Sequence, residues 1–257
     1  MLILLPPSEG KAQRGRGRPL DLSRLSFPEL ADARDRVLDA LTTSSALPNA
    51  VARLTAPVGA AAEVERNVRI RELGTLPAER LYTGVLYDAL DLASMETAAR
   101  RRARRWIVVT SALFGAVHLG DPLPPYRLPI CANLEGLAGP DQTAGLESYW
   151  RQHLPAPLTE AAGGGVIVDC RSSSYTPLWR PAGDLAERWV QIRVPGASHS
   201  AKHTRGLVTR HLCVAGSTAR HVPAVADEIG RAFAVELHEP ARPGKPWILD
   251  VHPPSPA

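Results

Sequence analysis

The chain of 257 residues has few cysteines, few aromatic residues and no long apolar run. Its three cysteines, Cys131, Cys170 and Cys213, lie far apart and form no Cys-x-x-Cys pair, which argues against a disulfide framework and against a cysteine-based zinc site. We expect inert buried thiols, with a redox-active thiol as the alternative. Residues 106–117 form the longest apolar stretch after the opening one, well short of the ~18 residues of a membrane helix.

An export signal is also excluded by what is missing. The opening apolar run, Met1–Leu5, has no basic residue before it and is too short for the apolar core of a signal peptide. The sequence therefore predicts a cytoplasmic protein with no membrane partner. Its net charge of +4 and its isoelectric point near 9.2 are a mild basic bias, compatible with an anionic partner.

Several motifs with a known chemistry are missing as well. The sequence contains no Walker A motif, no Gly-x-Gly-x-x-Gly, no Gly-x-Ser-x-Gly and no His-Glu-x-x-His. Among the eight histidines, only His199 and His203 have the i, i+4 spacing of a helical metal site, and no acidic residue stands near them in the sequence. We therefore expect no metal and no cofactor.

What is present is an alternation of strand-like and helix-like segments. Apolar or alternating runs predict strands at 1–5, 106–110, 163–170, 189–194, 232–237 and 245–251. Apolar residues at helical spacing predict helices within 27–45, 60–73, 88–105 and 200–216. The proline-rich end, 252–257, is expected to be disordered. Because strands and helices interleave without a long linker, we expect an α/β or mixed α+β protein with a single compact domain over residues 1–257.

Three of the predicted strands end in small, polar or charged residues. "LILL" runs into "PPSEGK", "WIVVT" into "SALFG", and "VIVD" into "CRSSSY". If the strands are parallel neighbours, these ends meet in the crevice where ligands bind such sheets. The residues that would converge are Ser8, Lys11, Ser111, Asp169, Arg171, Ser172 and Tyr175. Each stretch alone is also a common turn sequence. The three together favour a site, with Ser8 and Lys11 as working residues of the first loop.

Basic residues form a second set of candidates. Arg127, which follows Pro124-Pro125-Tyr126, can present its fork to a carboxylate or phosphate, or can lie solvated at a strand edge. Lys202 and Arg205 share one side near the start of a predicted helix, where cations oppose the helix dipole unless they hold an anion; a solvated basic face is the alternative.

Two arginine runs complete this set. Arg100–Arg105 ends a predicted helix, where cations complement the dipole, so a structural role is favoured for most of these residues. "RGRGR", residues 14–18, lies in a glycine-rich loop and is a better candidate for flexible phosphate contact.

Together these segments resemble the YaaA-like family of peroxide-stress proteins. "LILLPPSEGK" is similar to the family's opening strand and loop, "LYTGVLYDAL" (81–90) to its Tyr-x-Gly-Leu segment, and residues 111–130 to its block ending in Pro-Tyr-Arg-Leu. "SYW" (148–150), residues 168–179 and residues 201–212 resemble three further blocks in the same order. Ser174 stands where the family has an acidic residue, and the chain after residue 212 matches poorly.

The resemblance implies a mixed sheet flanked by helices and a cytosolic role in the response to hydrogen peroxide. The family is described as DNA-binding through a basic cleft and as limiting oxidative damage and free intracellular iron. On this chain the contacts to double-stranded DNA, or to another anion, would fall on Lys11, Arg127, Arg171, Lys202, Arg205 and Arg210. The residues expected to line a pocket are Tyr82, Gly84, Gly115, Tyr149, Trp150, Ser172, Tyr175 and Gly206.

An enzyme that acts on a small anionic substrate, similar to a nucleotide or a nucleobase, is the alternative. Its candidate catalytic residues are more varied than phosphate binding requires: Ser8, Lys11, Ser111, Tyr126, Asp169 and Lys202. A narrow pocket around Lys202, Tyr126 and Ser111 would favour the enzyme, and a broad basic groove would favour DNA. Direct iron binding has least support, because no spacing for two histidines and a carboxylate is visible. The sequence leaves the activity, the ligand and the oligomeric state open.

Overall fold

A seven-stranded mixed sheet forms the centre of the computed structural model, which describes residues 1–137, 145–196 and 198–252. The sheet order is β4-β3-β1-β6-β7-β9-β8, with β4 and β8 antiparallel at the two edges and the other strands parallel. The strands are β1 (Leu2–Leu5), β3 (Ile107–Ser111), β4 (Gly115–His118), β6 (Ile167–Asp169), β7 (Trp189–Arg193), β8 (Ala234–His238) and β9 (Trp247–His252). β2 (Leu76–Pro77) and β5 (Pro122–Leu123) pair as a small antiparallel sheet.

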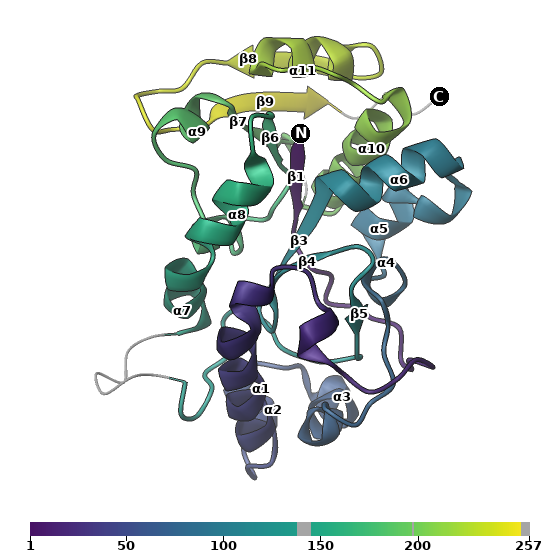
Figure 1. Ribbon diagram of the computed structural model, residues 1–257, viewed down its shortest axis with the longest axis vertical. Coiled ribbons are helices and arrows are strands. Elements are labelled where there is room, and N and C mark those ends of the chain that lie inside the picture. The colour runs from purple at the N-terminus through teal and green to yellow at the C-terminus, as the bar shows by residue number, and fades with distance from the viewer. Residues whose placement is uncertain (138–144, 197, 253–257) are drawn as a thin grey trace.

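Helices cover this sheet on both sides, as Figure 1 shows, with α5, α6 and α10 on one side of the central strands and α7, α8 and α9 on the other. β1 and β3 are therefore buried along their whole length, which explains their continuous apolar sequence. The helices are α1 (Ala31–Ser45), α2 (Ala50–Arg53), α3 (Ala61–Arg66), α4 (Ala78–Leu81), α5 (Val85–Leu90), α6 (Thr97–Trp106), α7 (Leu146–His153), α8 (Pro155–Ala162), α9 (Asp184–Glu187), α10 (Ser198–Ala215) and α11 (Val222–Gly230). The predicted mixed α/β class, with a mixed sheet flanked by helices, is confirmed.

Most predicted elements exist with shifted ends, and two helices differ in a way that the backbone explains. The helix predicted within 88–105 begins as the separate helix α5 and breaks at Asp91, whose φ of 42° is left-handed, before α6 starts at Thr97. The helix predicted at 60–73 ends at Arg66 and tightens into a short 3₁₀ turn, Asn67–Arg69. Of the tail expected to be disordered, residue 252 belongs to β9, and residues 253–257 lie outside the described residues.

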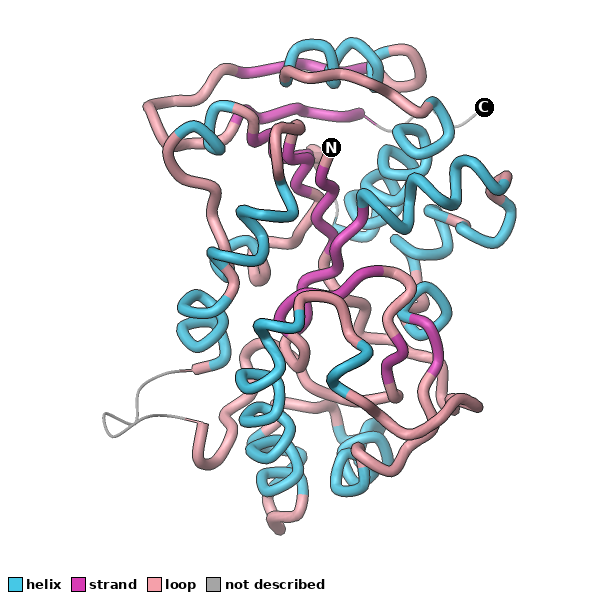
Figure 2. Tube along the Cα trace, viewed as in Figure 1, coloured by secondary structure: helices cyan, strands magenta, loops and turns pink. Residues whose placement is uncertain are grey.

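The carboxyl ends of β3, β1 and β6 meet at one edge of the sheet. β1 lies between the other two and is parallel to both, with Leu5 opposite Val109 and Leu4 opposite Asp169. The loops after these strands therefore leave side by side, as expected from the three apolar runs. In Figures 1 and 2 this edge faces the loop-rich part of the molecule that holds the small sheet and α1 to α3. No described helix combines the length and the apolar character that crossing a bilayer requires.

Candidate active site

The loop after β1 folds back on itself and holds the side chain of Lys11. Lys11 Nζ donates to the carbonyl oxygens of Ser8, at 2.8 Å, and of Glu9, at 3.4 Å. Ser8 Oγ donates to the Gly10 carbonyl oxygen and accepts the Thr83 backbone N–H at 3.1 Å. The backbone of Lys11 forms an isolated antiparallel bridge with Tyr82. The amine of Lys11 is thus held by carbonyls of its own loop.

Two aromatic rings also lie close to this amine. Lys11 Nζ lies 4.4 Å from the ring centroid of Tyr126 and 5.8 Å from that of Tyr82. Among the described residues, no carboxylate lies within ion-pair distance of Lys11. A cation over a ring is attracted by about 0.5–2 kcal/mol, which does not replace the hydration that an ammonium group loses on burial. The half-buried Lys11 is therefore an incompletely stabilised cation.

A chain of hydroxyl groups links the ends of β3 and α4 beneath Lys11. Ser111 Oγ accepts the backbone N–H groups of Leu113 and Phe114 at 3.2 and 3.1 Å, so its own hydrogen is directed to Tyr126 Oη, 2.9 Å away. Tyr126 Oη lies 3.0 Å from Tyr82 Oη. The two phenols share one hydrogen bond, which leaves one buried phenolic hydrogen without a partner among the described residues.

The surroundings lower the pKa of Lys11 from 10.5 to about 7. Burial is the main cause because it removes water from the ammonium form, and the nearby positive charge of Arg127 adds to it. The carboxylates of Glu63 and Glu9 act in the opposite direction and are the smaller effects. A sizeable fraction of the Lys11 side chains therefore carries a neutral amine near pH 7, the state in which lysine acts as a base or a nucleophile.

The tyrosines around Lys11 stay protonated. Burial raises the pKa of Tyr126, although its hydrogen bonds with Ser111 and Tyr82 oppose the rise. Burial is likewise the first cause that raises the pKa values of Tyr82, Tyr87 and Tyr175, and the neighbouring Tyr126 raises them further. These groups are therefore neutral hydrogen-bond donors around Lys11 rather than phenolates.

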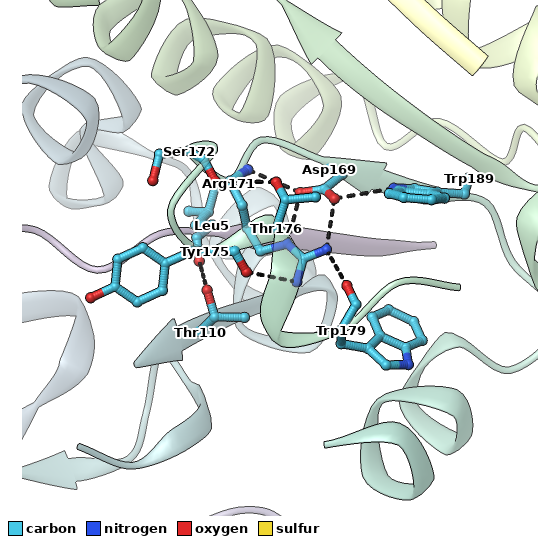
Figure 3. Close-up of polar contacts among 9 residues, drawn as sticks. All are labelled: Leu5, Thr110, Asp169, Arg171, Ser172, Tyr175, Thr176, Trp179 and Trp189. Atoms are coloured by element: carbon cyan, nitrogen blue, oxygen red, sulfur yellow. Dashed lines mark hydrogen bonds and ion pairs between the residues drawn. The ribbon is translucent and has the colours of Figure 1, made fainter. Parts of the chain in front are cut away.

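Asp169 and Arg171, two residues expected at the site, form a buried ion pair that shapes the loop after β6 (Figure 3). Arg171 donates to both Asp169 carboxylate oxygens, at 2.9 and 2.7 Å, and to the carbonyl oxygen of Trp179 at 2.8 Å. Trp189 Nε1 donates to the same carboxylate at 3.1 Å. The side chains of Arg171 and Asp169 are 0% and 1% exposed, so neither reaches a ligand in this arrangement. They position the turn that carries the half-buried Ser172 and the buried Tyr175.

The other expected cations are exposed to solvent or contact groups of the protein itself. Lys202 is exposed on α10. Arg205 Nε donates to the Ile192 carbonyl oxygen at 3.1 Å, and Arg210 donates to the carbonyl oxygens of Leu90 and Asp91 at the end of α5. Arg127 is 14% exposed and lies 3.6 Å from Glu63. Lys11 thus takes the place beside Tyr126 and Ser111 that the sequence analysis gave to Lys202.

Four of the residues expected to line a pocket, Gly115, Tyr149, Trp150 and Gly206, make close packing contacts or hydrogen bonds inside the protein. A Cβ atom at Gly115, whose φ is 70°, would lie 2.5 Å from the ring of Trp150. Trp150 Nε1 donates to the Ala112 carbonyl oxygen at 2.7 Å, and Tyr149 Oη donates to the Ala33 carbonyl oxygen at 2.9 Å. The Trp150 contacts support the turn after Ser111, and the Tyr149 bond connects α7 to α1. On α10, Gly206 lets the helix approach α5, because a Cβ there would lie 2.3 Å from the Leu86 carbonyl oxygen.

Comparison with known proteins identifies the family of this chain. A family model described as "Peroxide stress protein YaaA" matches residues 1–223. The chain belongs to the YaaA family. A UPF0246 protein of Streptomyces coelicolor is 43% identical over 261 residues, which cover 98% of each chain. A UPF0246 protein of Corynebacterium efficiens is 37% identical over 250 residues, 93% of this chain and 96% of the relative. The suspected resemblance is confirmed, and the family is associated with peroxide stress.

Two residues of this YaaA family member escaped the sequence analysis. Tyr87 Oη donates to the Pro6 carbonyl oxygen at 2.8 Å, and its ring stacks on Tyr82 with centroids 5.4 Å apart. Gly84, whose φ is 97°, starts the helix that carries Tyr87. The sequence signal that could have identified Tyr87 was its position within segment 81–90, which resembles a block of the family. Asn67 bonds both the N–H and the carbonyl of Arg127, at 3.0 and 2.8 Å, and thereby fixes the segment next to Tyr126. Nothing in the sequence marks Asn67.

Proposed function

We propose that this YaaA family protein is an enzyme for a small anionic substrate, in which the neutral amine of Lys11 acts as base or nucleophile. The observation that carries the proposal is the position of this amine: half-buried over Tyr126, with no carboxylate partner among the described residues and with a pKa near 7. A solvated lysine with its usual pKa of ~10.4 is neutral in fewer than ~1 in 10³ molecules at pH 7. At the same pH the neutral amine is far more abundant at Lys11, which makes Lys11 the better base or nucleophile.

An anion suits the groups around this amine. The guanidinium of Arg127 is near enough to lower the pKa of Lys11, and its contact with Glu63 is a loose one at 3.6 Å. A substrate carboxylate or phosphate can displace Glu63 and form the two parallel hydrogen bonds that arginine offers. These hydrogen bonds would orient the substrate against Lys11 Nζ.

Reaction with glyoxylate, a small anionic aldehyde, tests the nucleophilic form of this proposal. The neutral amine adds to the aldehyde carbon, water leaves, and hydride from cyanoborohydride reduces the imine to a stable secondary amine. The chain contains three lysines, Lys11, Lys202 and Lys245, so peptide mass spectrometry reports each one separately. We expect Lys11 to be modified well ahead of the exposed Lys202 near pH 7. Equal modification of the two lysines would contradict the proposal.

DNA binding is the second candidate function, favoured by cations that the fold leaves in solvent. Lys202 on α10 and the arginines of residues 14–18 are exposed, and the net charge is +4. A protein that binds DNA through phosphates loses affinity steeply between about 50 and 200 mM salt, with a log–log slope of about −0.9 for each phosphate contacted. Fluorescence anisotropy of a labelled duplex across that range measures the slope.

The variant for this test is Lys202→Ala, and Arg151→Ala is its control. Both changes remove one positive charge from an exposed position, but Arg151 lies on α7, across the sheet from α10 (Figure 1). We expect Lys202→Ala to weaken duplex binding and to reduce the slope by about one, and Arg151→Ala to change neither. Equal effects of both variants would assign the attraction to net charge alone.

The effect on free intracellular iron that the resemblance implies is then proposed to be indirect. Glu236, His238 and Asp250 form the one group of three possible metal ligands within the described part of the chain. Both oxygens of the Asp250 carboxylate already bind the guanidinium of Arg193. A metal ion would have to break that pair, so this group gives no support to iron storage by the chain itself.

A further inference from the structure

A separate hollow lies on the far side of the loop that carries Lys11. Its volume is about 520 Å³, within the range of ligand pockets. Its lining includes Gln13, Arg14, Gly15, Arg66, Gly74 and Pro125. Lys11 does not line it, although Pro125 directly precedes Tyr126 of the candidate active site.

The backbone that forms this hollow is pinned in place. A Cβ atom at Gly15 would lie 2.0 Å from the Gly74 carbonyl oxygen, so only glycine lets these two segments meet. Beside this contact, the Gly17 N–H donates to the Thr75 carbonyl oxygen at 2.8 Å, and the Thr75 N–H donates to that of Arg18 at 3.1 Å. The loop expected from its sequence to be flexible is therefore fastened through its backbone to residues 74–75, so less backbone entropy is lost when a ligand binds.

Two arginines face this hollow without a carboxylate to balance them. The side chain of Arg14 is exposed and has no hydrogen bond or ion pair with any described residue. Arg66 donates to Gln13 Oε1 at 3.0 Å, which orients its guanidinium and leaves its charge uncompensated. The hollow is lined by no acidic side chain. Two guanidinium groups that line one hollow can both donate hydrogen bonds to an oxyanion, whose negative charge also offsets their mutual repulsion.

We propose that this hollow binds the phosphate group of a small molecule between Arg14 and Arg66. The site stands apart from the chemistry proposed for Lys11 and does not depend on it. Its volume admits a ligand of nucleotide size, and Pro125 and the glycines offer backbone and apolar surface to the rest of that ligand.

Isothermal titration calorimetry with AMP and with inorganic phosphate tests the site. We expect Arg14→Ala and Arg66→Gln each to weaken AMP binding about tenfold or more, since each removes charge-assisted hydrogen bonds. Arg16→Ala is the matched control, because Arg16 lies on the same loop, is exposed and does not line the hollow. It should change the Kd less than about twofold. Arg14→Lys, which keeps the charge and loses the fork, should fall between these limits.

The outcomes separate this site from its alternatives. Loss of AMP binding in Arg14→Ala and Arg66→Gln, with Arg16→Ala unchanged, supports the proposal. No measurable binding, or equal weakening by all three changes, overturns it. Displacement of bound AMP by a short DNA duplex would overturn the assignment to a small molecule in favour of a DNA phosphate. Lys11→Met should leave AMP binding unchanged, because Lys11 does not line the hollow, whatever the outcome of the glyoxylate test; loss of AMP binding in Lys11→Met would assign AMP to the candidate active site and overturn the proposal.

Discussion

Replacing Arg171 by methionine tests the ion pair that shapes the candidate active site. The change keeps an unbranched apolar stem and removes the guanidinium, whose charge faces Asp169. The Asp169 carboxylate, 1% exposed, would keep two donors, the backbone N–H of residue 171 at 3.0 Å and Trp189 Nε1 at 3.1 Å, but no opposite charge. The carbonyl oxygen of Trp179 would lose its donor as well. Breaking a buried pair in this way typically costs about 3–5 kcal/mol, so we expect a loss of that size.

Urea denaturation followed by circular dichroism measures this loss of unfolding free energy. Arg180→Met is the matched control: it is the same change on the same loop, at an exposed position, and is expected to shift stability by less than about 0.5 kcal/mol. In the double variant Asp169→Asn/Arg171→Met the uncompensated charge is absent, so its cost should be smaller than that of Arg171→Met alone. A cost below about 1 kcal/mol for Arg171→Met would refute the buried pair.

Three further predictions follow from the contacts around the site. Lys11→Met should stabilise the protein near pH 7, and this gain in unfolding free energy should shrink towards pH 10. Over that interval Lys11 keeps its proton in the unfolded wild type but has released it in the folded state, so the wild type becomes more stable as the pH rises. Denaturation at several pH values measures the gain, and a constant gain would contradict the lowered pKa. Gly206→Ala should cost about 1–3 kcal/mol, because α10 must move away from α5, whereas Gly164→Ala, with no atom within 4 Å of the added Cβ, should not; differential scanning calorimetry compares the two. Tyr126→Phe should cost about 1–3 kcal/mol in urea denaturation, since the buried Ser111 hydroxyl loses its acceptor, and a cost near zero would mean that the hydroxyl chain is not formed.

The edge of the sheet at which the site lies could be predicted from sequence, because each strand is a contiguous apolar run that is visible in the sequence by itself. Three short apolar runs, each followed by a polar loop, are enough to place Lys11, Ser111 and Asp169 at one end of a parallel sheet. Local sequence also explains the role of Gly84, since α5 starts where a positive φ is needed. The general position of the site therefore followed from the pattern of apolar residues.

The partners of each side chain could not be predicted, because they come from distant parts of the chain. Tyr126 meets Tyr82 across 44 residues, and Arg127 meets Asn67 across 60. Whether an arginine is buried or exposed depends on such contacts too: Arg171 satisfies Asp169 inside the protein, whereas Lys202 remains in solvent. From sequence, Arg171 and Lys202 both belong to the expected anion contacts, because the residue type alone carries no information on burial.

The pKa of Lys11 is the most direct test of the proposed function. Reductive methylation with ¹³C-formaldehyde labels the three lysines and the N-terminal amine, and an NMR titration then follows each signal with pH. The signal that is missing in Lys11→Arg is the signal of Lys11. The account predicts that it titrates near pH 7, about three pH units below an ordinary lysine. A Lys11 signal that titrates near pH 10, in the range of an ordinary lysine, would contradict the lowered pKa.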